Sequence, residues 1–264
     1  MPRLAEAVAL GLVQGPAELL PISSSGHVAA IPWLLGWESR TTDAPELRKS
    51  VEVALHAGTA LALLIGLREE VDEAVRGFDA RRAGLVLWSF APPAAAGLAF
   101  ERLVEERLGT PPTIAAGLLA GSLALVLCDR APQRRRREDA GWVDALALGA
   151  AQATALVPGV SRNGATLSAA RARGFARADA NVLSRHTALP VIVGASVLKG
   201  VRLWRRGLPA SQAGTLAAGA AAAFASTLAS IRLIGLVERD RPLAWWAAYR
   251  TLAAAVILSA RAAR

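Results

Sequence analysis

A carboxylate, three hydroxyl groups and an imidazole fall within ten residues of one apolar stretch in this 264-residue chain. They belong to Glu18, the Ser23–Ser25 triplet and His27, with Gln14 one helical turn before the glutamate and Gly26 directly after the serines. An ionisable side chain in apolar membrane surroundings is costly and is by default a functional candidate. Gln14 and Glu18 are four residues apart, so they share one face of a helix. The serines and the glycine predict a tight turn at a helix end, where backbone N–H groups and hydroxyls bind anions.

A second apolar stretch carries the donors that a phosphate group needs. It contains Ser161, Arg162, Asn163 and Thr166, with Gly164 among them. The guanidinium fork of arginine binds phosphate oxygens in two directions, and hydroxyl and amide donors complete the shell. Taken alone, the stretch is equally compatible with a helix cap and an arginine that reaches the membrane surface. Its pairing with the first stretch, through an internal repeat, favours the phosphate clamp.

Together the two stretches supply an acid/base set and a phosphate clamp, which suits phosphoryl transfer. In one mechanism Ser24 attacks, activated by His27 while Glu18 orients the imidazole. In another, His27 itself becomes phosphorylated, or it activates a water molecule. A turn that merely buries a satisfied Glu18–His27 pair is the alternative without catalysis. Arg162, the turn amides and a divalent cation, Mg²⁺ or Ca²⁺, would stabilise charge on the phosphate oxygens.

The two stretches occupy equivalent places in an internal repeat, and repeats of this kind decide the architecture. Three of the matched pairs, each 138 residues apart, are Gln14 with Gln152, Ser23 with Ser161, and Gly26 with Gly164. The halves are residues 1–130 and 141–264, joined by an arginine-rich connector. Each half begins with an apolar segment broken by Pro, Gly and Ser, expected to form a re-entrant helix pair, and continues with three spans. Such paired broken segments indicate a midplane site between inverted repeats.

The composition is that of an all-α integral membrane protein. Hydrophobic residues make up 53% of the chain and charged residues only 19%, with a mean hydropathy of +0.36. Long runs with few or no charges approach the roughly 20 apolar residues that a helix needs to cross a bilayer. Most tryptophans lie near the ends of these runs, as an interfacial belt requires. The predicted spans are Val53–Leu67, Ala83–Phe100, Pro112–Cys128, Leu183–Leu198, Ala213–Ser230 and Leu243–Ala260.

The charge of the chain indicates contact with lipid headgroups rather than with nucleic acid. The formal net charge is +9, and all but two of the 30 basic residues are arginine. The connector run Arg134–Arg137 is expected to anchor the chain to anionic lipids, because no nucleic-acid-binding motif accompanies it. Cys128 is the only cysteine, which excludes a disulfide framework and a thiolate zinc site. The N-terminal apolar stretch lacks a small-residue cleavage site and is expected to belong to the mature protein.

Other polar residues in the predicted spans are assigned to packing. His56, His186 and Arg185 are expected to make polar contacts between helices. Arg232 and Arg250 are near span ends or tryptophans, so they are expected to reach the membrane interface.

The two motifs resemble those of the undecaprenyl-pyrophosphate phosphatase (bacitracin-resistance) family. Residues Gln14–Glu18 and Pro21–His27 match its Glu/Gln-x-x-x-Glu stretch and its Pro-x-Ser-Ser-x-Gly-His stretch. Residues Pro158–Thr166 are similar to its Pro-Gly-x-Ser-Arg-Ser-x-x-Thr signature, and Glu52–Thr59 is similar to its first spanning helix after the motif. Motif order, spacing and chain length agree across nearly all of the sequence.

The resemblance implies a multi-pass enzyme of the bacterial plasma membrane that converts undecaprenyl pyrophosphate to undecaprenyl phosphate, recycling this carrier for cell-wall synthesis. Its active site would open towards the extracytoplasmic side. Glu18 and His27 would be acid/base residues, Glu18 also a metal ligand, Ser24 the nucleophile or a phosphate ligand, and Arg162 the essential clamp. The substrate-binding residues would be Gln14, Ser23, Ser25, Gly26, Ser161, Asn163, Gly164 and Thr166.

Two positions depart from the most frequent form of the motifs. Gln14 stands at the first acidic position, which removes a charge that could bind a divalent cation. Asn163 stands where the signature more often has serine, so a role of that hydroxyl does not carry over.

The alternative function is a transporter or flippase for a phosphorylated polyprenyl lipid, since inverted repeats with broken helices are a transporter architecture. Transport needs the clamp but no nucleophile, so the Glu18–Ser24–His27 set favours the enzyme. A third possibility, a non-catalytic membrane subunit, would leave these buried polar residues without a purpose. The expected partners are the polyprenyl pyrophosphate substrate and membrane lipids, with no nucleic acid; the sequence leaves a homodimer open.

Overall fold

Apolar runs punctuated by Pro, Gly and charged residues form helices throughout the part of the chain that the computed structural model describes, residues 4–37, 44–207, 210–239 and 242–263. No β-strand occurs in these ranges beyond one isolated bridge, which confirms the all-α prediction. The helices are α1 (Leu4–Leu19), α2 (Ser24–Leu34), α3 (Ala44–Gly66), α4 (Arg68–Arg76), α5 (Ala80–Arg107), α6 (Pro111–Cys128), η1 (Arg137–Asp139), α7 (Trp142–Thr154), α8 (Arg162–Ala172), α9 (Arg177–Arg206), α10 (Ala210–Ser230), η2 (Ile231–Leu233), α11 (Ile234–Glu238) and α12 (Ala244–Ala262).

Within the described ranges, five segments are long and apolar enough to cross a membrane, so the protein is a multi-pass membrane protein. They are Lys49–Gly66, Ala80–Phe100, Pro111–Cys128, Arg177–Arg205 and Ser211–Glu238. The sixth predicted span is α12, which is helical but less apolar because it carries two tryptophans, a tyrosine and two arginines. Since α12 packs along α6, one of the five, its role as a sixth span stays a prediction.

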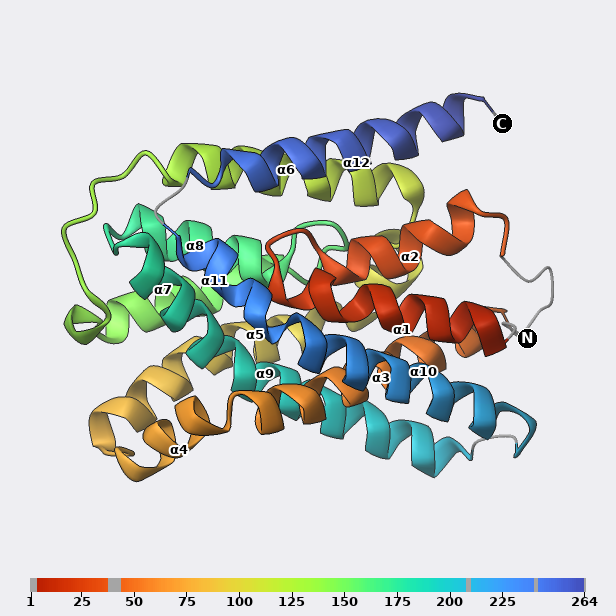
Figure 1. Ribbon diagram of the computed structural model, residues 1–264, viewed down its shortest axis with the longest axis horizontal. Coiled ribbons are helices and arrows are strands. Elements are labelled where there is room, and N and C mark those ends of the chain that lie inside the picture. Colours follow the sequence, from red (N-terminus) through yellow and green to blue (C-terminus); the bar gives the residue numbers. More distant parts are fainter. Residues whose placement is uncertain (1–3, 38–43, 208–209, 240–241, 264) are drawn as a thin grey trace.

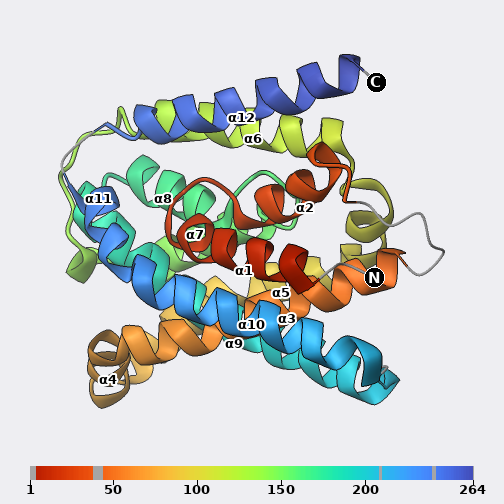
Figure 2. The ribbon, with the colours of Figure 1, turned by 45° about the vertical axis from the view of Figure 1, so that its right-hand side comes forward.

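The helices form three layers with the two broken segments in the middle (Figures 1 and 2). Helices α6 and α12 lie side by side on one face, and α3, α9 and α10 lie on the other. Each broken segment is a pair of short helices joined by a turn, α1 with α2 and α7 with α8. The two pairs enter from opposite ends of the molecule, so their turns meet in its interior (Figure 1). This is the arrangement that inverted repeats with a central site require.

Small residues let α1 lie directly against the backbone of α10. An added Cβ at Gly15 would lie 2.5 Å from the backbone N of Thr227, and one at Gly11 would lie 2.6 Å from the carbonyl O of Gly219. Glycines four residues apart are a common means of close helix approach in membranes. Pro16 cannot donate to the carbonyl of Leu12 four residues earlier, and the hydroxyl of Ser226 on α10 donates to this carbonyl instead, at 2.6 Å.

Gly15→Ala is expected to lower the free energy of unfolding by about 1–3 kcal/mol, the usual cost of overpacking a tight contact. Gly97→Ala on α5 is the matched control, because no atom of the described residues lies within 4 Å of its added Cβ and alanine is the better helix former. Thermal unfolding of both variants in detergent checks the expectation. Equal midpoints for the two variants would contradict the close α1–α10 contact.

The equivalent contact in the second half is between α7 and α5. An added Cβ at Gly149 would lie 2.8 Å from the carbonyl oxygens of Trp88 and Ser89. These carbonyls are four residues before Pro92 and Pro93, which have no N–H to donate to them. A side-chain donor from α7, Gln152, reaches the carbonyl of Ser89 at 3.2 Å.

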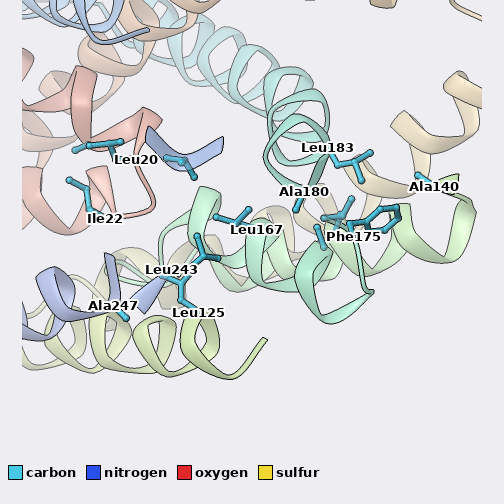
Figure 3. Close-up of a cluster of buried hydrophobic side chains, with 14 residues drawn as sticks. Leu20, Ile22, Leu125, Ala140, Leu167, Phe175, Ala180, Leu183, Leu243 and Ala247 are labelled. Atoms are coloured by element: carbon cyan, nitrogen blue, oxygen red, sulfur yellow. The ribbon is translucent and has the colours of Figure 1, made fainter. Parts of the chain in front are cut away.

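The largest apolar cluster among the described residues joins several helices and the first turn (Figure 3). Leu167 of α8 and Phe175 are fully buried within it, and Leu20 and Ile22 enter it from the first turn. Leu125 of α6 is also fully buried there. Because residues of both halves share one core, the position of each turn depends on the other half.

Ion pairs tie the connector to α7, which corrects one prediction. Arg135, expected to anchor lipids, makes two 2.8 Å hydrogen bonds to Asp144, and its guanidinium lies 4.2 Å from the centre of the Phe175 ring. Asp144 is 3% exposed, and a buried carboxylate requires such partners. Arg173 also donates to it, at 2.7 Å. Arg134, exposed like its neighbours Arg136 and Arg137, keeps the lipid-anchor prediction.

Asp129, directly after α6, is a second carboxylate that is held by arginines close to the connector. Burial alone would raise the pKa of Asp129, but hydrogen bonds from Arg177, from the backbone N–H of Leu243 and from Arg171 hold this pKa below its ordinary value. Because folding lowers the pKa, the contribution of Asp129 to stability is complete at neutral pH. It is lost in acid, as the pH falls below the ordinary carboxyl pKa.

The packing prediction is confirmed for two of the three residues concerned. Arg185 of α9 pairs with Glu70 of α4 and with Glu238 of α11, at 3.0 and 2.7 Å, and His186 lies 3.6 Å from Glu70. His56 instead hydrogen-bonds the carbonyl of Glu52 within its own helix, at 2.8 Å.

Candidate active site

Both turns pass through a strained serine immediately before the second helix of the pair. Ser23 has φ 77° and Ser161 has φ 67°, and they are the only non-glycine residues with positive φ in the described ranges. Each hydroxyl accepts a hydrogen bond from the backbone N–H three residues on, Gly26 at 3.3 Å and Gly164 at 3.1 Å. Such conformations cost about 1–3 kcal/mol each and tend to cluster at functional sites. Equivalent strain in both halves therefore marks this region as the candidate site.

The two turns touch each other where α2 and α8 begin. An added Cβ at Gly26 would lie 3.3 Å from the Cα of Gly159 in the other turn. Gly159 itself has φ +98° and lies against the backbone of Ile114 and Leu118 in α6, so no other residue fits there. The N-termini of two helices are thus brought together, and each helix N-terminus attracts anions through its free N–H groups and its dipole.

The carboxylate of Glu18 is hydrogen-bonded to side chains from both halves of the chain. It accepts hydrogen bonds from Gln14 Nε2 at 3.2 Å and from Ser24 Oγ at 2.6 Å. Across the turns, Arg162 Nη2 donates to the other carboxylate oxygen. Arg162 Nη1 donates to the carbonyl of Ala188 at 3.3 Å. The Glu18 side chain is 4% exposed and the Arg162 side chain 19%, so the guanidinium lies nearer the surface of this pair.

His27 lies apart from this group, which changes the expected activation of Ser24. Its Nδ1 is 2.7 Å from the carbonyl of Ser23, and its Nε2 is 2.8 Å from the hydroxyl of Tyr249 on α12. Both ring nitrogens are therefore engaged, and the Ser24 proton points to Glu18 instead. In this structure Glu18 neither orients the imidazole nor forms the buried pair with it that the sequence suggested.

The remaining predicted binding residues surround these groups. Ser25 Oγ lies 3.4 Å from Ser23 Oγ at the start of α2. Asn163 joins the two turns, because its Nδ2 donates to the carbonyl of Leu19 at 2.7 Å. Its Oδ1 accepts from Ser184 of α9 at 3.0 Å, and the Ser184 hydroxyl is 2.5 Å from that of Thr166. Asn163 and Thr166 thus tie the start of α8 to α1 and α9.

Asn163→Ala is expected to destabilise the fold by about 1–3 kcal/mol, because the Leu19 carbonyl loses its donor from the opposite turn. Chemical unfolding in detergent measures this loss. Wild-type stability in the variant would show that Asn163 does not join the turns.

Arg250 corrects the expectation that it reaches the membrane interface. It is fully buried, and its guanidinium donates to backbone carbonyls of both turns, Pro21 at 3.2 Å, Gly159 at 3.0 Å and Val160 at 2.9 Å. Gly164 leaves room for it, since an added Cβ there would lie 2.6 Å from Arg250 Nη1. The sequence offers one indication that Arg250 belongs to the site: it stands beside the chain's only tyrosine in an apolar run. Arg232 is exposed, as expected.

The oxygen atoms available near Glu18 are enough to bind a divalent cation only if oxygens of the substrate complete its coordination. The described residues contain no group of three or more His, Cys, Asp or Glu side chains that could hold a metal. Gln14 Oε1 is buried beside Glu18 and has no hydrogen-bond partner among the described residues, so one carboxylate oxygen and one amide oxygen are available as ligands. Mg²⁺ is commonly held by one or two carboxylates together with substrate phosphates and water, and these residues meet that need.

Comparison with known proteins gives one family over nearly the whole chain. The sequence profile of the family described as "Bacitracin resistance protein BacA" matches residues 7–256. The undecaprenyl-diphosphatase of Geobacter sulfurreducens is 38% identical, covering 96% of both chains. That of Pelobacter propionicus is 36% identical over 97% of this chain and 96% of its own. That of Elusimicrobium minutum is 39% identical over 73% of this chain and 74% of its own.

Proposed function

The chain belongs to the bacitracin resistance protein BacA family, and from this membership and the geometry of the two turns we propose that it hydrolyses undecaprenyl pyrophosphate. The reaction breaks the terminal P–O bond with water and yields undecaprenyl phosphate and inorganic phosphate. The proposal rests on one observation. Glu18 contacts both Ser24, the first residue of α2, and Arg162, the first residue of α8. This site offers a hydroxyl nucleophile, a carboxylate and a cationic clamp in one place.

The electrostatics of the site suit a pyrophosphate group. Arg162 contributes a guanidinium charge, and the N-termini of α2 and α8 add the partial positive charge of their free N–H groups. In phosphoryl transfer most of the catalysis comes from positioning and from stabilising charge on the equatorial oxygens. On substrate binding, Arg162 exchanges part of its contact with Glu18 for the phosphate oxygens.

Ser24 is the nucleophile that the contacts favour. Its hydroxyl donates to Glu18 at 2.6 Å, so the carboxylate is placed to take the proton as Ser24 attacks the terminal phosphorus. The bridging oxygen then leaves with the lipid monophosphate, and water releases phosphate from the serine. His27 assists the water step as proton acceptor: the water replaces the Tyr249 hydroxyl at Nε2 and gives up its proton there. Attack by His27 itself or by water directly are the two alternatives.

A divalent cation, Mg²⁺ or Ca²⁺, is a further element of the proposal. Glu18 and the amide oxygen of Gln14 would hold it together with pyrophosphate oxygens. When bound, it would neutralise charge that develops on the phosphate oxygens. The neutral Gln14 makes this site weaker than one built from two carboxylates, so chelation by EDTA should reduce activity readily.

The setting of the enzyme follows from its substrate, which cannot leave the bilayer. We place it in the bacterial plasma membrane with the site facing the extracytoplasmic side, which rests on the resemblance of the motifs alone. Membrane lipids are its other contacts. A homodimer, and the lack of a nucleic-acid partner, are predictions from the sequence.

Phosphate release by the purified protein in detergent tests the substrate. Undecaprenyl pyrophosphate should be hydrolysed, whereas undecaprenyl monophosphate and a soluble phosphate ester such as p-nitrophenyl phosphate should not. Equal hydrolysis of all three would overturn the assignment of a lipid pyrophosphate. Loss of activity in EDTA and its return with Mg²⁺ or Ca²⁺ would support the cation.

A further inference from the structure

The contacts of His27 define where its proton lies. Nδ1 is 2.7 Å from the carbonyl oxygen of Ser23. A carbonyl only accepts hydrogen bonds, so Nδ1 carries the proton, and in the neutral imidazole Nε2 keeps its lone pair. Nε2 is 2.8 Å from the hydroxyl of Tyr249, which therefore donates to it. The first contact is local, but the second comes from α12, at the other end of the chain.

The Tyr249 ring also restrains the plane of the imidazole. The two rings are stacked, with their centres 5.7 Å apart and their planes inclined by 11°. Tyr249 is the only tyrosine in the sequence, and 44% of it is exposed. Packing alone would be served equally by leucine or phenylalanine. The stacking and the hydrogen bond together fix both the tilt and the rotation of the imidazole, as a catalytic side chain requires.

The next residue of α12 fixes the register of the helix. Arg250 is buried and donates to carbonyls of both turns, including Pro21, which is two residues before Ser23. Helix α12 cannot slide or rotate without breaking these bonds. Tyr249 is therefore held at a fixed distance from the turn that carries Ser23 and His27.

We propose that Tyr249 is a positioning residue: in the free enzyme its hydroxyl and its stacked ring hold His27 in the Nδ1-protonated tautomer, and Nε2 accepts a proton once the attacking water has replaced that hydroxyl. The proposal rests on the proposed function, in which His27 assists the water step. Tyr249 is uncharged and acts through orientation. The charged groups of the neighbouring elements are Arg250 on α12 and the Glu18–Arg162 pair of α1 and α8, and a substitution of Tyr249 leaves all three unchanged.

Steady-state kinetics with two variants separates the ring from the hydroxyl. Tyr249→Phe keeps the stacking and loses the hydrogen bond, and Tyr249→Leu loses both. We expect kcat to fall about 10-fold and about 100-fold respectively, within the range of general acid–base effects, while KM stays within about two-fold. Trp245→Leu is the control, because Trp245 is on the same helix and is 73% exposed. An unchanged kcat in Tyr249→Leu would overturn the proposal.

A spectroscopic readout keeps the test independent of activity. The chain has three histidines, so ¹⁵N-histidine labelling gives three imidazoles, and His27→Gln identifies the one at this site. In the parent we expect a single tautomer with a protonated Nδ1. In Tyr249→Leu the unrestrained imidazole turns away from the Ser23 carbonyl, so we expect an average of both tautomers. An unchanged spectrum, even with a lower kcat, would overturn positioning through His27. An inactive parent whose spectrum still responds would refute the hydrolase function while the Tyr249–His27 contact stands.

Discussion

Arg162→Lys is expected to lower kcat/KM for undecaprenyl pyrophosphate by about 10³-fold, in the range found when a phosphate-stabilising arginine is lost. Lysine keeps the charge but has no planar fork, so it cannot contact Glu18 and two phosphate oxygens together. Arg162→Ala should lose at least as much. Phosphate release under single-turnover conditions measures the loss without interference from product release.

Arg205→Ala provides the matched control for this prediction. Arg205 is exposed near the end of α9, so its removal should leave the rate unchanged. Activity of Arg162→Lys within a few-fold of the parent would mean that Arg162 acts as a structural ion-pair partner and does not bind the transferring phosphate.

Glu18→Gln is expected to produce a loss of similar size, about 10³-fold or more in kcat. The amide cannot take the Ser24 proton, and it leaves the guanidinium of Arg162, whose side chain is 19% exposed, without its counter-charge. Breaking a buried ion pair by removing one partner commonly costs about 3–5 kcal/mol of stability. Thermal unfolding must therefore accompany the kinetics, so that a folded but inactive variant is distinguished from an unfolded one. Glu69→Gln, an exposed carboxylate on α4, is the control.

The pair Glu18 and Ser24 offers a sharper version of this experiment. If Ser24 attacks and Glu18 takes its proton, the two residues act as a unit and their effects do not add. The double variant Ser24→Ala/Glu18→Gln should then be no slower than the slower of the two single variants. Additive losses would mean that the two residues serve separate steps, and attack by His27 or by water would become the better mechanism.

The helices were predictable from the sequence, and so was the pairing of the broken segments. Apolar runs near the length of a bilayer admit few alternatives to a helix. The 138-residue repeat puts the two motifs at equivalent positions of the two halves. The repeat does not imply equal roles. Gln14 donates to Glu18, whereas its counterpart Gln152 donates to a carbonyl freed by the prolines of α5. The difference has a local cause and a tertiary cause: the residue four positions on is Glu18 in the first half but Leu156 in the second, and α5 offers Gln152 a free carbonyl.

The partners of His27 and Arg135 were beyond the reach of local pattern. Proximity in sequence suggested that His27 would serve Ser24, but its side chain is directed to α12, more than 200 residues away. Arg250 was assigned to the interface because it is close to tryptophans, yet carbonyls gathered from both turns satisfy its charge. Arg135 has the sequence context of a lipid anchor, but Asp144 lies beside it and pairs with it. In each case the deciding partner is brought near by tertiary packing.

The most direct test of the central claim uses undecaprenyl pyrophosphate labelled in its terminal phosphate, given to the purified protein and to Arg162→Ala and His27→Ala. We predict that the parent releases the label as inorganic phosphate and leaves unlabelled lipid monophosphate, with near-total loss of release by the folded Arg162 variant and a strong reduction in the His27 variant. If the label stays on the lipid in the parent under several divalent-ion conditions, the enzyme account is wrong and transport of the intact lipid becomes the leading explanation.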